Sequence, residues 1–341
     1  MFSTRFSSPL SRVASKKVAA VALVLASGTL AACSTAADTS GTAGATGAAA
    51  LGGESDTATV SLASASELGG VGSLDSSSVH ELSISFDDDA YDAMLAVYQE
   101  TGEKDWIDAT VTIDGTTYDE VGIRLKGNSS LRGVTESSTP ESLPWLIRLD
   151  KFVDDQSHEG LTDLVVRSNT TETALNEAVA LELLELAGLA SQDAIATSFS
   201  VNGSASVLRL VIENPDDEWM AEEFDDTGAL YKAESTGDYT YRGDDPDSYD
   251  EVFDQEAGDD NADLTELIEF LDFVNNTDDD TFESELGDHL DIEAFATYLA
   301  MQDLIDNFDD IDGPGNNSYL YLDTETDRFT VVAWDHNLAF G

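Results

Sequence analysis

The sequence predicts an α+β fold of two lobes, with a sheet-rich N-lobe over about 79–212 and a helix-rich C-lobe over about 213–341. Three observations predict this division. Short runs of alternating apolar and polar residues dominate the first part and are typical of half-buried strands. A single long helical pattern interrupts these runs from about Thr171. After Glu213 the apolar residues recur mainly at helical spacing.

The N-lobe pattern begins with two expected strands that flank a short helix at 91–101. Asp114-Gly115 is a dipeptide that favours a tight hairpin turn, and Asn202-Gly203 marks a turn. The long helix carries an apolar stripe and stops at Gly188. That stripe consists of Leu175, Val179, Leu183 and Leu186. The strands expected in this lobe are 81–86, 106–114, 123–126, 145–149, 163–167, 197–201 and 207–212.

The C-lobe pattern begins with a short strand at 230–232, followed by an acidic insertion at 237–263. An insertion of this length without a clear apolar period is expected to be a mobile surface loop. Two helices are expected next, at 264–274 and 292–299. The chain then ends with two strands, 319–322 and 329–334.

The N-terminal residues 1–33 have the composition of a secretory signal peptide. Four basic residues precede an apolar run at 18–30, which is too short to span a bilayer. Cys33 is the only cysteine, so no intrachain disulfide can form. A lone Cys at this position resembles the lipobox of bacterial lipoproteins. The resemblance implies a lipid-modified Cys33 that anchors the protein to the outer face of the cytoplasmic membrane, whereas the alternative is an ordinary signal peptide with an incidental Cys.

Residues 34–78 are mostly Ala, Gly, Ser and Thr, with scattered acids and no aromatic side chain. Such a segment cannot bury enough apolar surface to offset its loss of entropy, so a disordered tether is expected. The remaining residues, 79–341, are long enough for one large domain or two small ones.

The charge balance narrows the classes of partner. The chain has 15 basic and 69 acidic residues, and the formal net charge is −54. The predicted signal peptide holds four of the basic residues and no acid, which leaves eleven basic residues for the mature chain. A field of this sign repels nucleic acid and anionic lipid, so nucleic-acid binding is excluded and membrane contact is expected only through the lipid anchor. An anionic substrate needs a local basic cluster or bound cations.

Against this acidic background, Arg124 and Lys126 are conspicuous. Their spacing in an expected strand places both side chains on one face. A small-residue turn follows, whose backbone N–H groups could approach an anion. Such a turn is more often only a hairpin, but two cations on one face of an acidic chain favour phosphate binding. The turn consists of Gly127, Asn128, Ser129 and Ser130.

The last 36 residues carry the second candidate site. Asp309, Asn317 and Asp335 offer oxygen ligands and a candidate base on turns beside two expected strands. Hard oxygen ligands of this kind suit Mg²⁺ or Mn²⁺, and Ca²⁺ as a further alternative. Phosphoryl transfer needs such ligands because it depends on positioning and charge neutralisation. The residues therefore favour an enzyme that uses a metal-bound nucleotide.

Four blocks of the sequence resemble, in order, the CotH family of spore-coat-protein kinases. They are VGIRLKGNSS at 121–130, GALYK at 228–232, NFDDIDGPGNNSYLY at 307–321 and WDHNLAFG at 334–341. The resemblance implies an atypical protein-kinase-like fold. It also implies an extracytoplasmic kinase that transfers the γ-phosphate of ATP to Ser or Thr of surface or secreted proteins, with a divalent cation.

The same resemblance implies roles for individual residues. Asp309 falls at the family's catalytic aspartate, while Asp312 competes for that role because it lies five residues before Asn317. Asn317 and Asp335 fall at metal ligands.

On the phosphate side, Arg124, Lys126 and the turn after them match a basic block near the ATP phosphates. Glu177 is a candidate ion-pair partner of the lysine that contacts the phosphates. Arg148 competes with Lys126 for this ion-pairing position.

Departures from the family pattern keep a second interpretation open. Asn316 stands where the family commonly has His, and Asn337 where it often has a second Asp. Members of the family often continue beyond the position of Gly341, which indicates a fragment or a shortened variant. The alternative function is a non-catalytic surface binding or adhesion module with a degenerate kinase fold that binds divalent cations.

Overall fold

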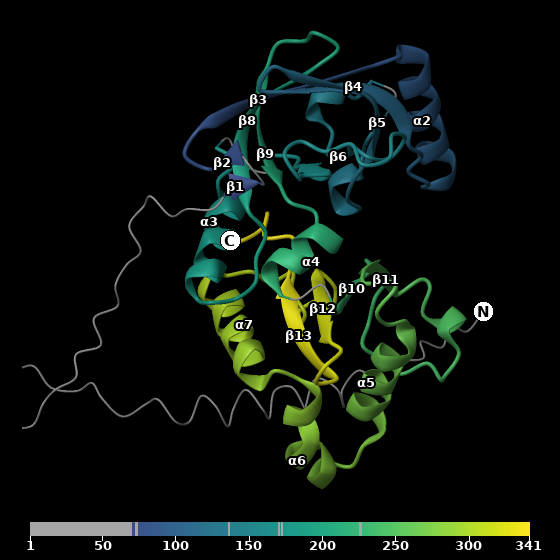
Figure 1. The fold of residues 1–341 in the computed structure, drawn as a ribbon, viewed down its shortest axis with the longest axis vertical. Coiled ribbons are helices and arrows are strands. Elements are labelled where there is room, and N and C mark those ends of the chain that lie inside the picture. The colour runs from purple at the N-terminus through teal and green to yellow at the C-terminus, as the bar shows by residue number, and fades with distance from the viewer. Residues whose placement is uncertain (1–69, 72–73, 136, 170, 172, 225–226) are drawn as a thin grey trace, which may run out of the picture. The chain divides into compact units, whose positions relative to one another are not determined.

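The computed structural model describes residues 70–341 except 72–73, 136, 170, 172 and 225–226 (Figure 1). The predicted signal peptide with Cys33, and most of the predicted tether, lie outside the described residues. In the part of the chain that is described, no helix is both long and apolar enough to cross a membrane. Two short paired strands, β1 (Gly70–Val71) and β2 (Leu74–Asp75), precede the main elements.

Seven strands form a closed barrel, and most of them are labelled in the upper part of Figure 1. Around the barrel the order is β3, β4, β5, β6, β7, β9 and β8. All neighbours are antiparallel except β3 and β8, whose parallel pairing closes the barrel. The strands are β3 (Val79–Phe86), β4 (Ile107–Ile113), β5 (Thr116–Leu125), β6 (Trp145–Arg148), β7 (Asp163–Val166), β8 (Ala194–Val201) and β9 (Val207–Ile212).

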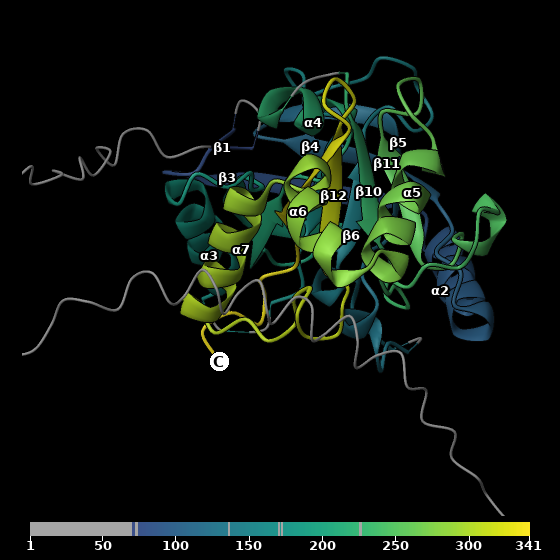
Figure 2. The same ribbon diagram turned by 90° about the horizontal axis from the view of Figure 1, so that it is seen from below.

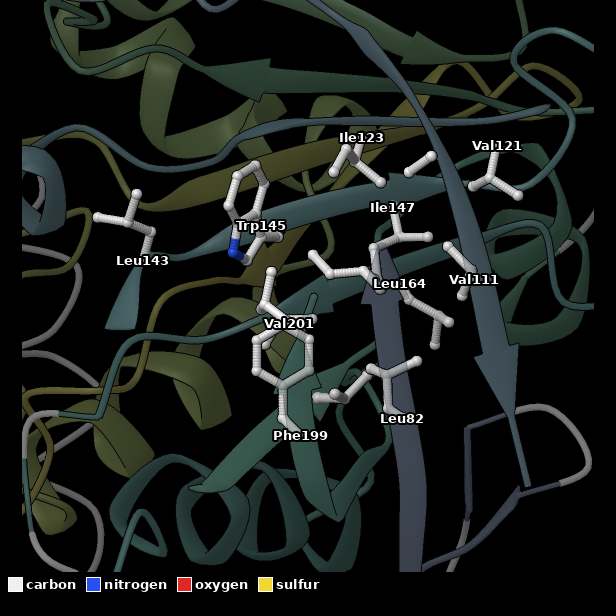
Figure 3. Packing of buried hydrophobic residues seen from close by; sticks show 14 of the residues in the cluster. Leu82, Val111, Val121, Ile123, Leu143, Trp145, Ile147, Leu164, Phe199 and Val201 are labelled. Carbon is white, nitrogen blue, oxygen red and sulfur yellow. The ribbon is translucent and has the colours of Figure 1, made fainter. Parts of the chain in front are cut away.

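The barrel is filled by apolar side chains that alternate along its strands. Figure 3 shows labelled side chains from β3, β4, β5, β6, β7 and β8 pointing toward one another, with Trp145 and Phe199 as the labelled aromatic members. Ile123 and Leu125 on β5 are fully buried, whereas Arg124 between them points out of the core. Because successive residues of a strand face opposite sides, a packed core fixes Arg124 on the outer surface.

The C-terminal part is built on a four-stranded antiparallel sheet in the order β11, β10, β12, β13. Helices accompany this sheet in Figure 1, and Figure 2 shows α6 in front of β12, with α7 to its left and α5 to its right. The strands are β10 (Ala229–Ala233), β11 (Phe253–Ala257), β12 (Ser318–Asp323) and β13 (Arg328–Ala333). The helices of the described chain are α2 (Asp88–Thr101), α3 (Asn176–Leu186), α4 (Asp217–Glu223), α5 (Leu264–Asn276), α6 (Asp279–His289) and α7 (Ile292–Leu304), with three 3-10 turns, η1 (Ser129–Leu131), η2 (Pro140–Ser142) and η3 (Pro246–Ser248).

The predicted fold class is wrong. The expectation was a two-lobed, kinase-like arrangement with a sheet-rich N-lobe and a helix-rich C-lobe, whereas the structure has a closed barrel and a second, four-stranded sheet. Barrel closure was missed because β3 and β8 are more than 100 residues apart in the chain and no local pattern reports their pairing. The second sheet was missed because residues 253–257, inside the expected loop at 237–263, form β11 beside β10.

The orientation of α3 also differs from the prediction. Leu175, Val179 and Leu186 of the expected buried stripe are 50%, 46% and 58% exposed. The buried face instead carries Glu177 together with Ala180, Leu181 and Leu184. The helix is apolar on several sides, so its amphipathic pattern could not select a face. A buried ion pair of Glu177, described below, accompanies the observed orientation.

Candidate functional site

The pairing of β12 with β13 brings the end of the chain beside the loop that precedes β12. Ser318 lies opposite Ala333 in the register, so Asn317 and Trp334 follow at the same edge. Asn317 has φ 56° and Asp335 has φ 62°. Both angles lie in the left-handed region, which costs about 1–3 kcal/mol for a residue held there and is concentrated at functional sites. The two predicted metal ligands are thus held in uncommon backbone conformations next to each other.

Asp309 joins this edge through the loop between α7 and β12. The side-chain amide of Asn317 donates a hydrogen bond to the backbone oxygen of Asp309 over 2.9 Å. Burial, and then the negative charge of Asp335, raise the pKa of Asp309. The structure therefore brings Asp309, Asn317 and Asp335 together, although their catalytic and metal-binding roles stay predictions.

Asp310, rather than Asp312, shapes this loop. Its buried carboxylate accepts hydrogen bonds from the backbone N–H groups of Asp312, over 3.1 Å, and Gly313, over 3.0 Å. A Cβ on Gly313 would lie 2.1 Å from the backbone oxygen of Phe308, so only glycine fits this turn. The side chain of Asp312 is exposed.

A buried polar chain supports the loop that carries Asp335. His336 is fully buried, and its Nε2 lies 3.1 Å from the amide nitrogen of Gln302 on α7. The Gln302 side-chain oxygen accepts a hydrogen bond of 2.8 Å from Asn307. Burial lowers the pKa of His336 to about 4, so the ring is neutral near pH 7. These contacts tie the turn after β13 to the start of the loop that holds Asp309.

Arg167, just after β7, forms ion pairs with two carboxylates of the site. Its Nε donates to Glu177 over 2.7 Å, and its guanidinium also forms an ion pair with Asp335. Burial disfavours the charge of Arg167, but Asp335 and Glu177 outweigh it and raise the pKa of Arg167. Burial raises the pKa of Glu177 despite this cation. The structure thus gives Glu177 a partner in Arg167, where the prediction was a lysine.

Arg124 and Lys126 lie on the barrel side of the site. The Lys126 ammonium donates to the side-chain oxygen of Asn214 over 2.9 Å. It also lies 5.7 Å from the ring centroid of Trp334, and the Arg167 guanidinium carbon lies at the same distance from that ring. The Trp334 ring therefore lies between Lys126, a predicted phosphate-binding residue, and Arg167, the ion-pair partner of the predicted metal ligand Asp335.

The amine of Lys126 is poised to change its charge near neutral pH. Burial, and then the positive charge of Lys232, lower the pKa of Lys126 to about 7. Arg124 lies over the ring of Trp106, 4.7 Å from its centroid, and burial lowers the pKa of Arg124 as well. An anion bound among these side chains would favour their charged forms and raise their pKa values again.

Arg148, the predicted alternative to Lys126 as the ion-pairing cation, forms its ion pair with Asp163. Its guanidinium forms a two-pronged ion pair with the buried carboxylate of Asp163, with nitrogen to oxygen distances of 2.9 and 2.7 Å. The side-chain amide of Asn214 also donates to Asp163 over 3.2 Å. Arg148 therefore fixes the carboxylate that supports Asn214, the hydrogen-bond partner of Lys126.

The turn after Lys126 is tight. Gly127 has φ 95°, and a Cβ at this position would lie 2.2 Å from Ser130 Oγ. Ser129 and Ser130 begin the 3-10 turn η1, while Asn128 and Ser129 are exposed. The structure places this turn at the end of β5, beside Lys126, and its phosphate-binding role stays a prediction.

Sequence reasoning missed three residues of the site, namely Arg167, Asn214 and Lys232. The scarcity of basic residues, which singled out Arg124 and Lys126, applies equally to Arg167 and Lys232. Arg167 also directly follows an apolar strand, where a cation is conspicuous. Asn214 carried no comparable signal, because an Asn after a strand is an ordinary turn residue.

Two sets of oxygen ligands could hold a divalent cation in the described part of the chain. One is Asp309, Asn317 and Asp335, whose carboxylates approach closely enough for one to shift the pKa of the other. The other comprises Glu234, Asp254 and Glu256, which offer oxygens within 4.8 Å of one another. Both sets have the chemistry that Mg²⁺, Mn²⁺ or Ca²⁺ requires. In the second set, however, Lys232 already forms ion pairs with two of the three carboxylates.

Comparison with known proteins identifies the family. No curated protein matches the sequence. The sequence profile of the family described as CotH kinase protein matches residues 123–341. That range covers more than half of the chain and contains the last three residues of β5, Arg167, Glu177 and the whole of the four-stranded sheet. The chain belongs to the CotH kinase protein family.

Proposed function

We propose that this protein is a protein kinase that transfers the γ-phosphate of ATP to Ser or Thr of an acceptor protein. The observation that carries the proposal is the arrangement around Trp334. Asp335, which follows Trp334 in the chain, lies with Asp309 and Asn317, and Lys126 approaches the Trp334 ring from the barrel. Phosphoryl transfer requires positively charged side chains that bind the phosphates, next to oxygen ligands that bind a metal ion. Membership of a family described as kinases supports this assignment.

In this proposal each group of side chains has one task. Lys126 and Arg124 neutralise the phosphates, and Arg167 orients Asp335. Asp335 and Asn317 would hold a divalent cation, which supplies positive charge to the phosphate oxygens. The acceptor hydroxyl oxygen forms a bond to the γ-phosphorus while the bond from that phosphorus to the β–γ bridging oxygen breaks. Asp309 takes the hydroxyl proton, and ADP leaves.

The experiment is transfer of labelled γ-phosphate to a serine-rich acceptor protein by the full chain with Mg²⁺ or Mn²⁺, beside Asp335→Asn. We expect incorporation by the wild type and a loss of at least about 100-fold in the variant. Equal labelling by both, or no labelling together with no thermal shift on adding ATP, would contradict the proposal. A shift with Ca²⁺ alone, without any effect of nucleotide, would indicate a binding module instead.

The proposal includes a location and an acceptor class. We infer from the sequence that Cys33 carries a lipid that anchors the protein outside the cytoplasmic membrane, where surface or secreted proteins are the available acceptors. The net charge of −54 favours a neutral or basic acceptor segment over an acidic one.

The pKa of Lys126 predicts that nucleotide binding depends on pH. In the free protein this pKa is about 7, and the phosphates of ATP should raise it. Well below pH 7, Lys126 is then charged both free and bound, so its own contribution to the affinity does not change with pH there. Above pH 7 binding must take up a proton, and affinity should fall by up to about tenfold per pH unit until the pKa of the bound state is reached.

Isothermal titration calorimetry with ATP between pH 6 and 9 measures this dependence. Lys126→Arg provides the control, because an Arg side chain keeps its charge over the whole range. The charges that face Lys126 are those of Lys232, Glu256, Arg124 and Asp163. A wild-type affinity that does not change with pH would rule out proton uptake by Lys126.

A further inference from the structure

Four basic residues from separate segments form one group, which we call the basic cluster: Lys104, Arg124, Lys126 and Lys232. Lys104 precedes β4, Arg124 and Lys126 lie at the end of β5, and Lys232 lies on β10 of the second sheet. The charge of Lys232 lowers the pKa of Lys126, and Arg124 and Lys232 both act on Lys104. The cluster takes four of the eleven basic residues that follow the predicted signal peptide, in a chain with 69 acids. Glu234 and Glu256 form ion pairs with one member of the cluster, Lys232, and a bound anion would reduce the repulsion among the four cations further.

Lys232 is held in place from two sides. Its ammonium forms ion pairs with Glu234, two residues further along the chain, and with Glu256 on β11 over 3.4 Å. The Lys232 side chain is only 19% exposed. Burial disfavours its charge, but Glu256 and Glu234 raise its pKa, so Lys232 stays protonated near pH 7. The two glutamates thus keep a charged amine beside Lys126.

Two buried hydrogen-bond donors, one within the basic cluster and one next to it, lack an acceptor. In the described residues, Arg124 Nε and the hydroxyl of Tyr319 are buried without any hydrogen-bond partner. Tyr319 is 0% exposed and lies directly opposite Lys232 in the pairing of β10 with β12. A buried donor without an acceptor costs about 1–3 kcal/mol. Unpaired donors beside a group of cations indicate a ligand that is rich in acceptor oxygens and negatively charged.

We propose that Lys232 is a polyphosphate-binding residue, which Glu234 and Glu256 hold in position opposite Lys126, so that the sheet and the barrel each supply a cation to one anion site. The proposal rests on the proposed function in naming the triphosphate of a nucleotide as the ligand. Glu234 and Glu256 are positioning residues, because their carboxylates contact Lys232 rather than phosphate. The Tyr319 hydroxyl and Arg124 Nε provide further donors to the same oxygens.

A metal bound by Glu234, Asp254 and Glu256 explains these contacts less well. Lys232 already supplies the positive charge between two of the three carboxylates, and a cation there would have to displace it. A divalent ion would also face Arg124, Lys126 and Lys104, whose charges repel it. It would leave the Arg124 donor without an acceptor. The polyphosphate satisfies the cations and the donors together.

The test is calorimetric titration of the full chain with inorganic tripolyphosphate and, separately, with ATP and adenosine, at pH 6.5 and low salt. Lys232→Met should weaken tripolyphosphate and ATP by about tenfold or more, because a charge-assisted contact is lost. Adenosine binding should not change, and Lys232→Arg should restore most of the lost affinity. Arg328→Met is the matched control. It removes a cation from the same sheet, but one that is 44% exposed and paired with Asp291.

The outcomes separate this proposal from the proposed kinase activity. If Lys232→Met binds tripolyphosphate and ATP as the wild type does, Lys232 is not a phosphate contact, although the kinase assignment stands. If the wild type binds tripolyphosphate and Lys232→Met does not, the site is supported even where no phosphoryl transfer is detected. Binding of neither anion by the wild type overturns both proposals. Thermal melts of each variant exclude loss of folding, and a Ca²⁺ shift lost in Glu256→Gln but kept in Lys232→Met would favour the metal site instead.

Discussion

Replacing Asp309 with Asn is expected to lower the rate of phosphoryl transfer by about 10²–10⁴, the range for loss of a general base. Affinity for ATP should change little, because Asp309 acts on the acceptor hydroxyl in the proposed mechanism. The loop should keep its shape, since the substitution does not remove the hydrogen bond that Asn317 donates to the backbone oxygen of Asp309. Labelled-phosphate incorporation at saturating ATP, with calorimetry for binding, measures both quantities.

Asp312→Asn is the matched control for this prediction. Asp312 lies in the same loop, but its side chain is exposed and its backbone N–H, not its carboxylate, makes the hydrogen bond to Asp310. We expect at least about 80% of wild-type activity in this variant, because an exposed substitution away from the reacting atoms is close to neutral. A large loss in Asp312→Asn together with an active Asp309→Asn would assign the base to Asp312. Full activity in both would exclude either residue as the base.

The strands could be predicted well where the apolar pattern alternates. β3, β4, β6, β7 and β9 lie within two residues of the expected ranges at each end. The turns at Asp114-Gly115 and at Asn202-Gly203 were also predicted correctly. Asp114 and Gly115 have φ 45° and 85°, and Asn202 and Gly203 have φ 47° and 75°. These are the positive angles that Asn, Asp and Gly adopt in tight turns, so local chemistry was sufficient there.

The architecture could not be predicted, because it depends on pairings that no local pattern reports. The parallel contact of β3 with β8 closes the barrel, and its partners Leu82 and Phe199 are separated by two α-helices and four strands. β11 reads as an acidic segment, FDQEA, and is a strand only because β10 offers it an edge. The helix-rich second lobe was therefore an error of tertiary pairing rather than of residue preference.

In the candidate site, too, the residues that depend on local order could be predicted, and those that depend on long-range pairing could not. Asp309, Asn317 and Asp335 lie together because β12 and β13 form an adjacent hairpin, which sequence order alone suggests. Arg167 and Lys232 reach the site from a barrel strand and from β10, and only the folded chain shows these positions. The rarity of positive charge singles out all eleven basic residues after the predicted signal peptide equally. The prediction applied that argument only to Arg124 and Lys126, although Lys232 also ends one of the family-like blocks, GALYK at 228–232.

Replacing Arg167 with Met is expected to lower the free energy of unfolding by about 3–5 kcal/mol at pH 7.5, the range for breaking a buried ion pair. The substitution leaves Glu177, which is 3% exposed, and Asp335 without the cation that compensates them. Arg328→Met is the control, because the exposed pair with Asp291 should contribute at most about 1 kcal/mol. Urea denaturation of both variants measures the difference.

The deficit of Arg167→Met should shrink as the pH falls. Burial already raises the pKa of Glu177 above its value in the unfolded chain, and removing Arg167 should raise it further. A carboxylate with a raised folded-state pKa favours the folded protein when it is protonated, and this contribution is lost as pH rises through that pKa. The variant is therefore expected to approach wild-type stability toward about pH 4.5, the usual range of a glutamate in an unfolded chain. A deficit that is constant between pH 8 and pH 5 would show that lost packing of the Arg167 side chain, and not unpaired charge, destabilises the variant.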